Sequence, residues 1–367
     1  MSDTIKEKFL PIKALNEEVY NILIHDKLEF DRLTRLKKGI KQSLRRYKVG
    51  GLKTVFHKRT HKKIIDRINT PSGKKKILYI TITPSFNLLR QSIYIRKDGN
   101  YETILLMESP WLIKLMEQHF DAAYVYNSYY ELACILKEVK PYLIHVQGSM
   151  MGSDFLCILA KLLSNTKIIF EFYDVPSLTI NKEDSISTWG TKNTELGFFA
   201  EQFACEYTDG IILGYSSEAA EILKKHHNIK CSILEFHSYP CKEFFADKSS
   251  RFNNCLVYGG TVYPKNCEKI FSSYQLYDLI KVITKQNFYF DVYASPHISS
   301  VSFEKHFTDY FNFATRDGYF KFHKGILPTE APKVFSQYDF GVLVYFFKGD
   351  LNNPVNSHNK IRLPNKI

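Results

Sequence analysis

The sequence predicts an α/β protein with two parallel-sheet domains that follow a basic helical extension. Its 367 residues exceed the usual size of one hydrophobic core. From Lys74 onward, short apolar runs alternate with segments of helical periodicity, a pattern typical of parallel sheets covered by helices on both faces. Before that point the chain is rich in Lys and Arg and carries few strand signals.

Composition excludes several other classes of protein. No run of about 18 apolar residues occurs, which argues against a membrane-spanning helix, and the N-terminus lacks the apolar centre of a signal peptide. The seven cysteines form no Cys-x-x-Cys pair, so we expect reduced thiols and neither a disulfide framework nor a zinc site. These features predict a cytoplasmic protein.

Residues 1–73 form the predicted basic extension. Residues 32–67 carry fourteen Lys or Arg and one acidic residue, whereas the rest of the chain has 36 basic and 37 acidic residues. An apolar stripe at helical spacing predicts an amphipathic helix; it comprises Leu33, Leu36, Ile40, Leu44 and Tyr47. We expect residues 32–67 to adhere to an anionic membrane, which would place the protein on the inner face of the cell membrane. The alternatives are a helix packed on its own domain and, with less support, nucleic-acid binding.

Residues 74–250 are predicted to form the first domain. Strands are expected at 77–83, 101–107, 122–126, 141–147, 167–172, 210–213 and 231–236, with helices at 111–120, 128–139, 155–163, 194–207 and 217–226. A polar stretch at 242–254 reads as the connection to a second domain, residues 251–367. There we expect strands at 256–258, 288–293, 319–322 and 340–345, and helices at 267–284 and 330–337. Both domains are predicted to be Rossmann-like doubly wound sheets, the second one incomplete.

The strand ends carry the chemical signals, because ligands of parallel α/β sheets bind beyond the carboxyl ends of the strands. Gly259 and Gly260 follow a strand directly, and glycines there allow backbone N–H groups to face a diphosphate. Lys265 could supply the opposing positive charge. The alternative is an ordinary tight turn between a strand and a helix.

Four segments resemble those of the bacterial retaining glycosyltransferases of family 4 (group 1), which have the two-domain GT-B fold. They are Pro141-Tyr-Leu-Ile-His-Val-Gln-Gly-Ser149, Phe170-Glu-Phe-Tyr-Asp174, Phe322-His-Lys-Gly325 and Leu363-Pro-Asn-Lys-Ile367. Their order and spacing agree with the family over residues 77–367. The resemblance implies a transferase that moves a sugar from a nucleoside-diphosphate sugar to a saccharide or lipid-linked acceptor of the cell envelope.

The resemblance also implies roles for single residues. The donor would meet Gly259, Gly260, Lys265, Gly325 and Lys366, and the acceptor would meet Gly148 and Ser149. Either Asp174 or His145 would polarise the acceptor hydroxyl. No cofactor or metal is expected, because side-chain charge and a helix N-terminus would stabilise the leaving diphosphate. The alternative readings are a core histidine for His145 and a turn cap for Asp174.

Two departures from the family pattern favour other functions. Thr261 and Val262 stand where the family often has an arginine, and the family's donor-binding glutamate pair would follow Ile367, the last residue of the sequence. We therefore expect a C-terminally truncated second domain. The alternatives are a non-catalytic pseudoenzyme or docking subunit, and a nucleotide-sugar epimerase.

Overall fold

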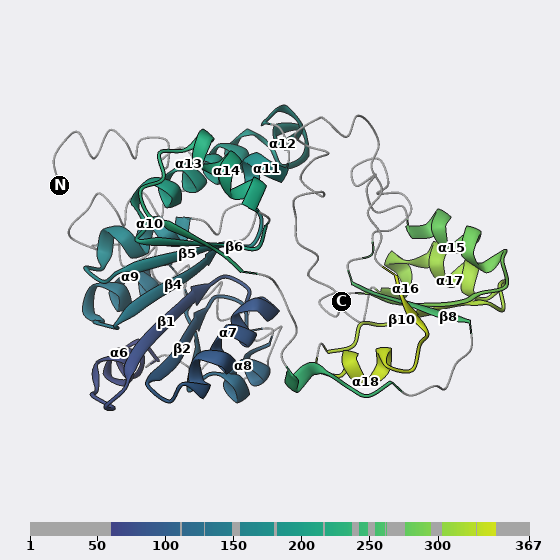
Figure 1. The fold of residues 1–367 in the computed structure, drawn as a ribbon, viewed down its shortest axis with the longest axis horizontal. Helices are drawn as coiled ribbons and strands as arrows, with labels where there is room; N and C mark the ends of the chain where they lie inside the picture. Colours follow the sequence, from purple (N-terminus) through teal and green to yellow (C-terminus); the bar gives the residue numbers. More distant parts are fainter. Residues whose placement is uncertain are drawn as a thin grey trace, which may run out of the picture. The chain divides into compact units, whose positions relative to one another are not determined.

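The computed structural model describes residues 60–110, 112–127, 129–148, 155–179, 182–215, 217–236, 242–248, 254–260, 262, 276–294, 303–327 and 329–342 (Figure 1). The described residues divide into two compact units at the junction between Phe236 and His237. The sequence placed the domain boundary at residue 250. Most of the predicted basic extension lies outside the described residues.

The first unit is built on a seven-stranded parallel sheet in the order β3-β2-β1-β4-β5-β6-β7. Its central strands are buried along almost their whole length, as expected of a sheet covered on both faces. The strands are β1 (Lys75–Thr81), β2 (Tyr101–Met107), β3 (Ala122–Val125), β4 (Leu143–Gly148), β5 (Ile168–Phe172), β6 (Gly210–Leu213) and β7 (Ser232–Glu235).

Helices follow the strands as crossover connections and form two layers. Because parallel crossovers are right-handed, helices that lead outward from β1 toward β3 cover one face, and those that lead from β3 back toward β7 cover the other. The first layer holds α7 (Phe86–Lys97) and α8 (Ile113–His119), which pack against each other. The second layer includes α9 (Tyr129–Glu138), α10 (Phe155–Leu163), α11 (Pro176–Thr179), α12 (Lys182–Trp189), α13 (Thr191–Tyr207) and α14 (Ser217–His226).

Helix α6 (Thr60–Asn69) is the part of the basic segment that the structure describes. Its three isoleucines, Ile64, Ile65 and Ile68, are buried, and the helix packs on α9. Arg67 forms an ion pair with Glu102 of β2. The apolar face of α6 therefore belongs to the domain core, while the charged side chains of Lys62 and Lys63 point to solvent.

The second unit contains a four-stranded parallel sheet in the order β10-β9-β8-β11. One face carries an aromatic core of Phe290, Phe303, Phe307, Phe320 and Phe322. The opposite face packs against α18, mainly through Val334 and Phe335. The elements are η1 (Lys242–Phe244), β8 (Cys255–Gly260), α15 (Leu276–Thr284), β9 (Tyr289–Ala294), α16 (Phe303–His306), α17 (Thr308–Ala314), β10 (Phe320–His323), α18 (Ala331–Phe335) and β11 (Phe340–Gly341).

These two sheets confirm the predicted fold class of two Rossmann-like parallel-sheet units. Strands β2 and β6 and helices α10 and α14 begin and end at the predicted residues. Helices α7, α11, α12, α16 and α17 were not predicted. Among the residues described, no helix has both the length and the apolar character needed to cross a membrane.

Gly259 provides a test of packing in the second unit. A Cβ atom at this position would overlap the ring of Phe335, so Gly259→Ala forces that ring out of its place between α18 and β8. We expect a loss of about 1–3 kcal/mol in the free energy of unfolding, the usual range for overpacking. Chemical denaturation of the full chain measures it.

Gly318→Ala is the matched control, because a Cβ atom there meets nothing within 4 Å; its effect should stay within about 0.5 kcal/mol. The double variant Gly259→Ala with Phe335→Leu should recover part of the loss. Equal effects of the two single glycine variants would contradict this account of the packing.

Candidate functional site

The candidate site in the first unit lies where the strand order reverses. The chain runs outward from β1 to β3 and then returns to place β4 on the other side of β1. At such a switch point the neighbouring helices lie on opposite faces, which leaves the carboxyl ends of two strands uncovered. In this unit the two strand ends belong to β1 and β4.

Two polar side chains join the ends of these strands. Gln147 of β4 donates from Nε2 to Ser85 Oγ over 2.6 Å, and the Ser85 amide donates to Gln147 Oε1 over 3.2 Å. Ser85 is also the N-cap of α7, where its side chain accepts from the amide of Leu88. The pair fixes the N-terminus of α7 beside Gly148.

Two of the predicted acceptor-side residues lie at this edge. Gly148 is the last residue of β4, and its carbonyl accepts from the amide of Tyr173 over 3.1 Å, which brings the β5 end alongside. Asp174 follows one residue later and is partly exposed. Ser149 lies outside the described residues. The structure therefore brings Gly148 and Asp174 to the same edge of the sheet.

His145 lies deeper, in the middle of β4. It is 3% exposed, its ring lies against Tyr79 at 4.8 Å, and its Nε2 is 3.0 Å from Glu171 Oε2. Gln91 of α7 donates to the same carboxylate oxygen over 3.1 Å. Burial, with the Glu171 charge as a second cause, raises the pKa of the Tyr79 hydroxyl, which therefore stays protonated. Together these four residues form a polar cluster beneath the Ser85–Gln147 pair.

A second buried carboxylate supports the segment after Asp174. Glu201 of α13 is fully buried and accepts from the amide of Ser177 over 2.8 Å, from the Ser177 hydroxyl, and from His227 Nε2 over 2.7 Å. Val175 is held as well, because its amide donates to the hydroxyl of Tyr215 over 3.3 Å. The backbone that follows Asp174 is thus fixed by two side chains, one from α13 and one from the segment between β6 and α14.

The second unit has its own switch point, between β8 and β11. Gly259 and Gly260 end β8, level with Tyr293 and Ala294 of β9. Gly325 follows β10, whose last residue, His323, is level with Tyr293. The three glycines predicted to meet the donor therefore share the carboxyl edge of this sheet. Lys265 and Lys366 lie outside the described residues.

Below this edge, Asp291 organises a polar and aromatic cluster with Tyr293, His323 and Tyr338. Its Oδ2 accepts from Tyr338 over 2.7 Å and is 2.9 Å from His323 Nε2. The Tyr293 and Tyr338 hydroxyls are 3.1 Å apart, and the rings of Tyr293 and His323 stack at 4.4 Å. Burial, followed by its bonds to Tyr293 and Asp291, raises the pKa of Tyr338, which keeps it a donor to Asp291. The cluster ties the end of β10, and hence Lys324 and Gly325, to β9.

Sequence reasoning missed Ser85, Gln147, Glu171 and Asp291. Ser85 follows Pro84 and stands three residues before Leu88, a recognisable helix start that would also have revealed α7. Gln147 directly precedes the glycine that ends its strand. Glu171 and Asp291 lie inside strands, where sequence pattern alone does not show which partner a carboxylate will find.

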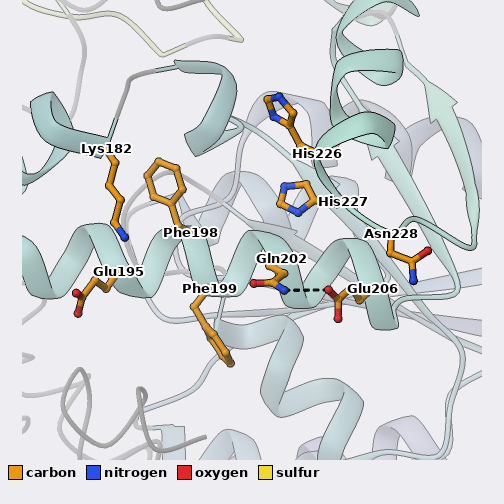
Figure 2. Close-up of a pocket in the computed structure, with 9 residues that line it drawn as sticks. All are labelled: Lys182, Glu195, Phe198, Phe199, Gln202, Glu206, His226, His227 and Asn228. Atoms are coloured by element: carbon orange, nitrogen blue, oxygen red, sulfur yellow. Dashed lines mark hydrogen bonds between the residues drawn. The ribbon is translucent and has the colours of Figure 1, made fainter. Parts of the chain in front are cut away.

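A groove of about 610 Å³ lies on the outer layer of the first unit, along α13 (Figure 2). Phe198 and Phe199 line it together with polar side chains, and Gln202 donates to Glu206 across 2.9 Å. It contains none of the predicted site residues. Among the described residues, no group of three or more His, Cys, Asp or Glu side chains is placed to hold a metal ion.

The fold is similar to that of solved glycosyltransferases. The sucrose-phosphate synthase of Thermosynechococcus elongatus matches with a TM-score of 0.50 and 10% identity, over 73% of this chain and 75% of that one. Anabaena HepE, solved with UDP, gives a TM-score of 0.49 and 12% identity over 72% and 73% of the two chains. A glycosyltransferase from Rickettsia africae gives 0.46 and 13% over 74% and 73%.

No family model and no curated protein matches the sequence. At these identities the structural likeness concerns the fold and not the substrate. The order of the strands in both sheets and the likeness to sucrose-phosphate synthase agree with the expectation from the sequence motifs: the chain has the GT-B glycosyltransferase fold.

Proposed function

We propose that the protein is a glycosyltransferase that moves a sugar from a nucleoside-diphosphate sugar to a saccharide or lipid-linked acceptor in the synthesis of a cell-envelope polysaccharide. The observation that supports this most directly is the pair of switch points. Each has glycines at the carboxyl edge of a parallel sheet, Gly148 in one unit and Gly259, Gly260 and Gly325 in the other. The likeness of the fold to that of sucrose-phosphate synthase supports the same class of reaction.

In this proposal the second unit binds the donor. The backbone amides near Gly259 and Gly260 would face the diphosphate, with Lys265 and Lys366 supplying positive charge in place of a metal ion. Gly325 would meet the nucleotide base through its backbone. The Asp291 cluster fixes the strand that leads to Gly325, so it would preserve the shape of that contact.

The first unit would bind the acceptor near Gly148 and Ser149. Asp174 is the better placed of the two predicted catalytic residues, because it is partly exposed at the sheet edge, whereas His145 is buried and bonded to Glu171. Asp174 would accept a hydrogen bond from the acceptor hydroxyl as that oxygen attacks the sugar. His145 would act through Glu171 as a positioning residue. The resemblance to family 4 supports retention at the anomeric carbon.

The first test is binding of UDP, GDP, ADP and CDP to the full chain by calorimetry, followed by release of the diphosphate from matching nucleotide-sugars. We expect one nucleoside diphosphate to bind in the micromolar range, which corresponds to about −8 kcal/mol. Transfer to an oligosaccharide or lipid-linked acceptor would then be detected by mass spectrometry. If none of the four nucleotides bound, the proposal would fail.

Asp291→Ala should weaken nucleotide binding about tenfold, because His323 and Tyr338 lose the carboxylate that they share and the end of β10 loosens. Calorimetry with the preferred nucleotide measures the change. Asp309→Ala, an exposed carboxylate on α17, is the matched control and should bind as the unaltered chain does. Equal affinity of both variants would show that the cluster does not support the donor site.

The variants Asp174→Asn and His145→Ala should distinguish the proposed catalytic role of Asp174 from the proposed positioning role of His145. Asp174→Asn should lower kcat/KM at least tenfold and change the free energy of unfolding by less than about 1 kcal/mol. His145→Ala should lower the free energy of unfolding by about 1–3 kcal/mol, because Glu171 stays buried without that donor. Steady-state kinetics and chemical denaturation measure the two quantities. A kinetic defect for His145→Ala without loss of stability would favour His145 as the catalytic group.

A further inference from the structure

The amino edge of the first sheet carries exposed lysines and tyrosines that the proposed transfer reaction does not use. Lys75 begins β1, Tyr142 precedes β4, and Lys167 precedes β5. These three strands are neighbours in the sheet. Because the amino ends of parallel strands share one edge, the three residues lie at the same edge of the sheet.

Direct contacts confirm this placement. Lys75 Nζ lies 4.7 Å from the centre of the Tyr142 ring, and the rings of Tyr142 and Tyr101, the first residue of β2, are 6.3 Å apart. Tyr142 is 54% exposed. A large amphipathic side chain is thus held at the surface between lysines.

The charge of this edge is predominantly positive. Its acidic groups are mostly neutralised by ion pairs: Glu102 with Arg67, Asp121 with Arg96, and Asp209 with Lys161. Exposed carboxylates are Asp66 on α6, Asp98 in the turn before β2 and Glu138 at the end of α9. The exposed lysines are Lys62, Lys63, Lys74, Lys75, Lys140 and Lys167, and we call these lysines, with Tyr142, the amino-edge surface.

Helix α6 connects this surface to the most basic part of the sequence. Asn69 donates to the carbonyl of Glu138 over 2.9 Å and accepts from the amide of Lys140 over 3.0 Å, which fixes the end of α6 at the amino edge. Residues 32–59, which lead into α6, contain eleven Lys or Arg and no acidic residue. The most basic part of the sequence therefore directly precedes a helix whose last residue lies at this surface.

We propose that the amino-edge surface binds the anionic headgroups of a lipid bilayer. Each lysine near such a surface adds attraction to it, and tyrosine is enriched at the level of the headgroups, where its ring and hydroxyl meet apolar and aqueous surroundings. Strands of six or seven residues, about 20 Å long, separate the amino edge from the switch point, so a bound membrane would leave the candidate acceptor site open.

The experiment is flotation of the full chain with vesicles of phosphatidylcholine that contain about 30 mol% phosphatidylglycerol, compared with phosphatidylcholine alone. The test variant is Lys75→Glu, Lys140→Glu and Lys167→Glu combined. The control variant combines Lys225→Glu, Lys285→Glu and Lys305→Glu, three exposed lysines elsewhere with the same change in charge. Circular dichroism and thermal unfolding establish that both variants fold.

We expect binding to the anionic vesicles alone, at low salt, with at least tenfold weaker binding for the test variant and near-normal binding for the control. The single variant Tyr142→Ser should also weaken binding to the anionic vesicles, although it leaves the charge of the surface unchanged. Three results would each overturn the proposal. They are an equal loss of vesicle binding in both triple variants, unchanged vesicle binding of the test variant, and binding of the chain to a DNA duplex but not to vesicles. Nucleotide affinity of the test variant should be unchanged, so this result is independent of the proposed transfer reaction.

Discussion

The handedness of parallel connections determines where this protein can bind a ligand. The crossover between two parallel strands is right-handed. A chain that adds strands first on one side of its first strand and then on the other side must therefore change the face of the sheet on which its helices pack. That change occurs between β1 and β4 in the first unit and between β8 and β11 in the second. The uncovered strand ends carry Ser85, Gln147 and Gly148 in one sheet and Gly259 in the other.

Polar clusters, buried in the first unit and partly exposed in the second, support both edges from below. Glu171 shares one oxygen between His145 and Gln91, and Asp291 shares one between His323 and Tyr338. The buried Glu171 carboxylate would be costly without such donors, and the partly exposed Asp291 joins β9 to His323 of β10 and to Tyr338, so each cluster keeps its strands in a defined position. In each unit the cluster lies next to the strand end that the proposed reaction would use.

The sequence was sufficient for features that depend on local pattern. Apolar runs gave β2 and β6 to the residue, and the glycines at 148 and 260 are the last residues of β4 and β8. Helix α7 escaped prediction because its mixed composition, with Asn87, Arg90 and Gln91, blurs the apolar stripe. The pairing of His145 with Glu171 depends on the register of β4 against β5, residues that are 26 positions apart, and no local pattern encodes it.

Glu201 makes the stability of a very short helix depend on the longer helices around it. A four-residue helix such as α11 has too few internal hydrogen bonds to persist by itself. The amide of Ser177, however, is bonded to a fully buried carboxylate on α13 that also holds His227 at the end of α14. Solvent can reach that amide only when this part of the helical layer opens, so hydrogen exchange in α11 should follow the slow opening of the layer and not the fast fraying of an isolated turn.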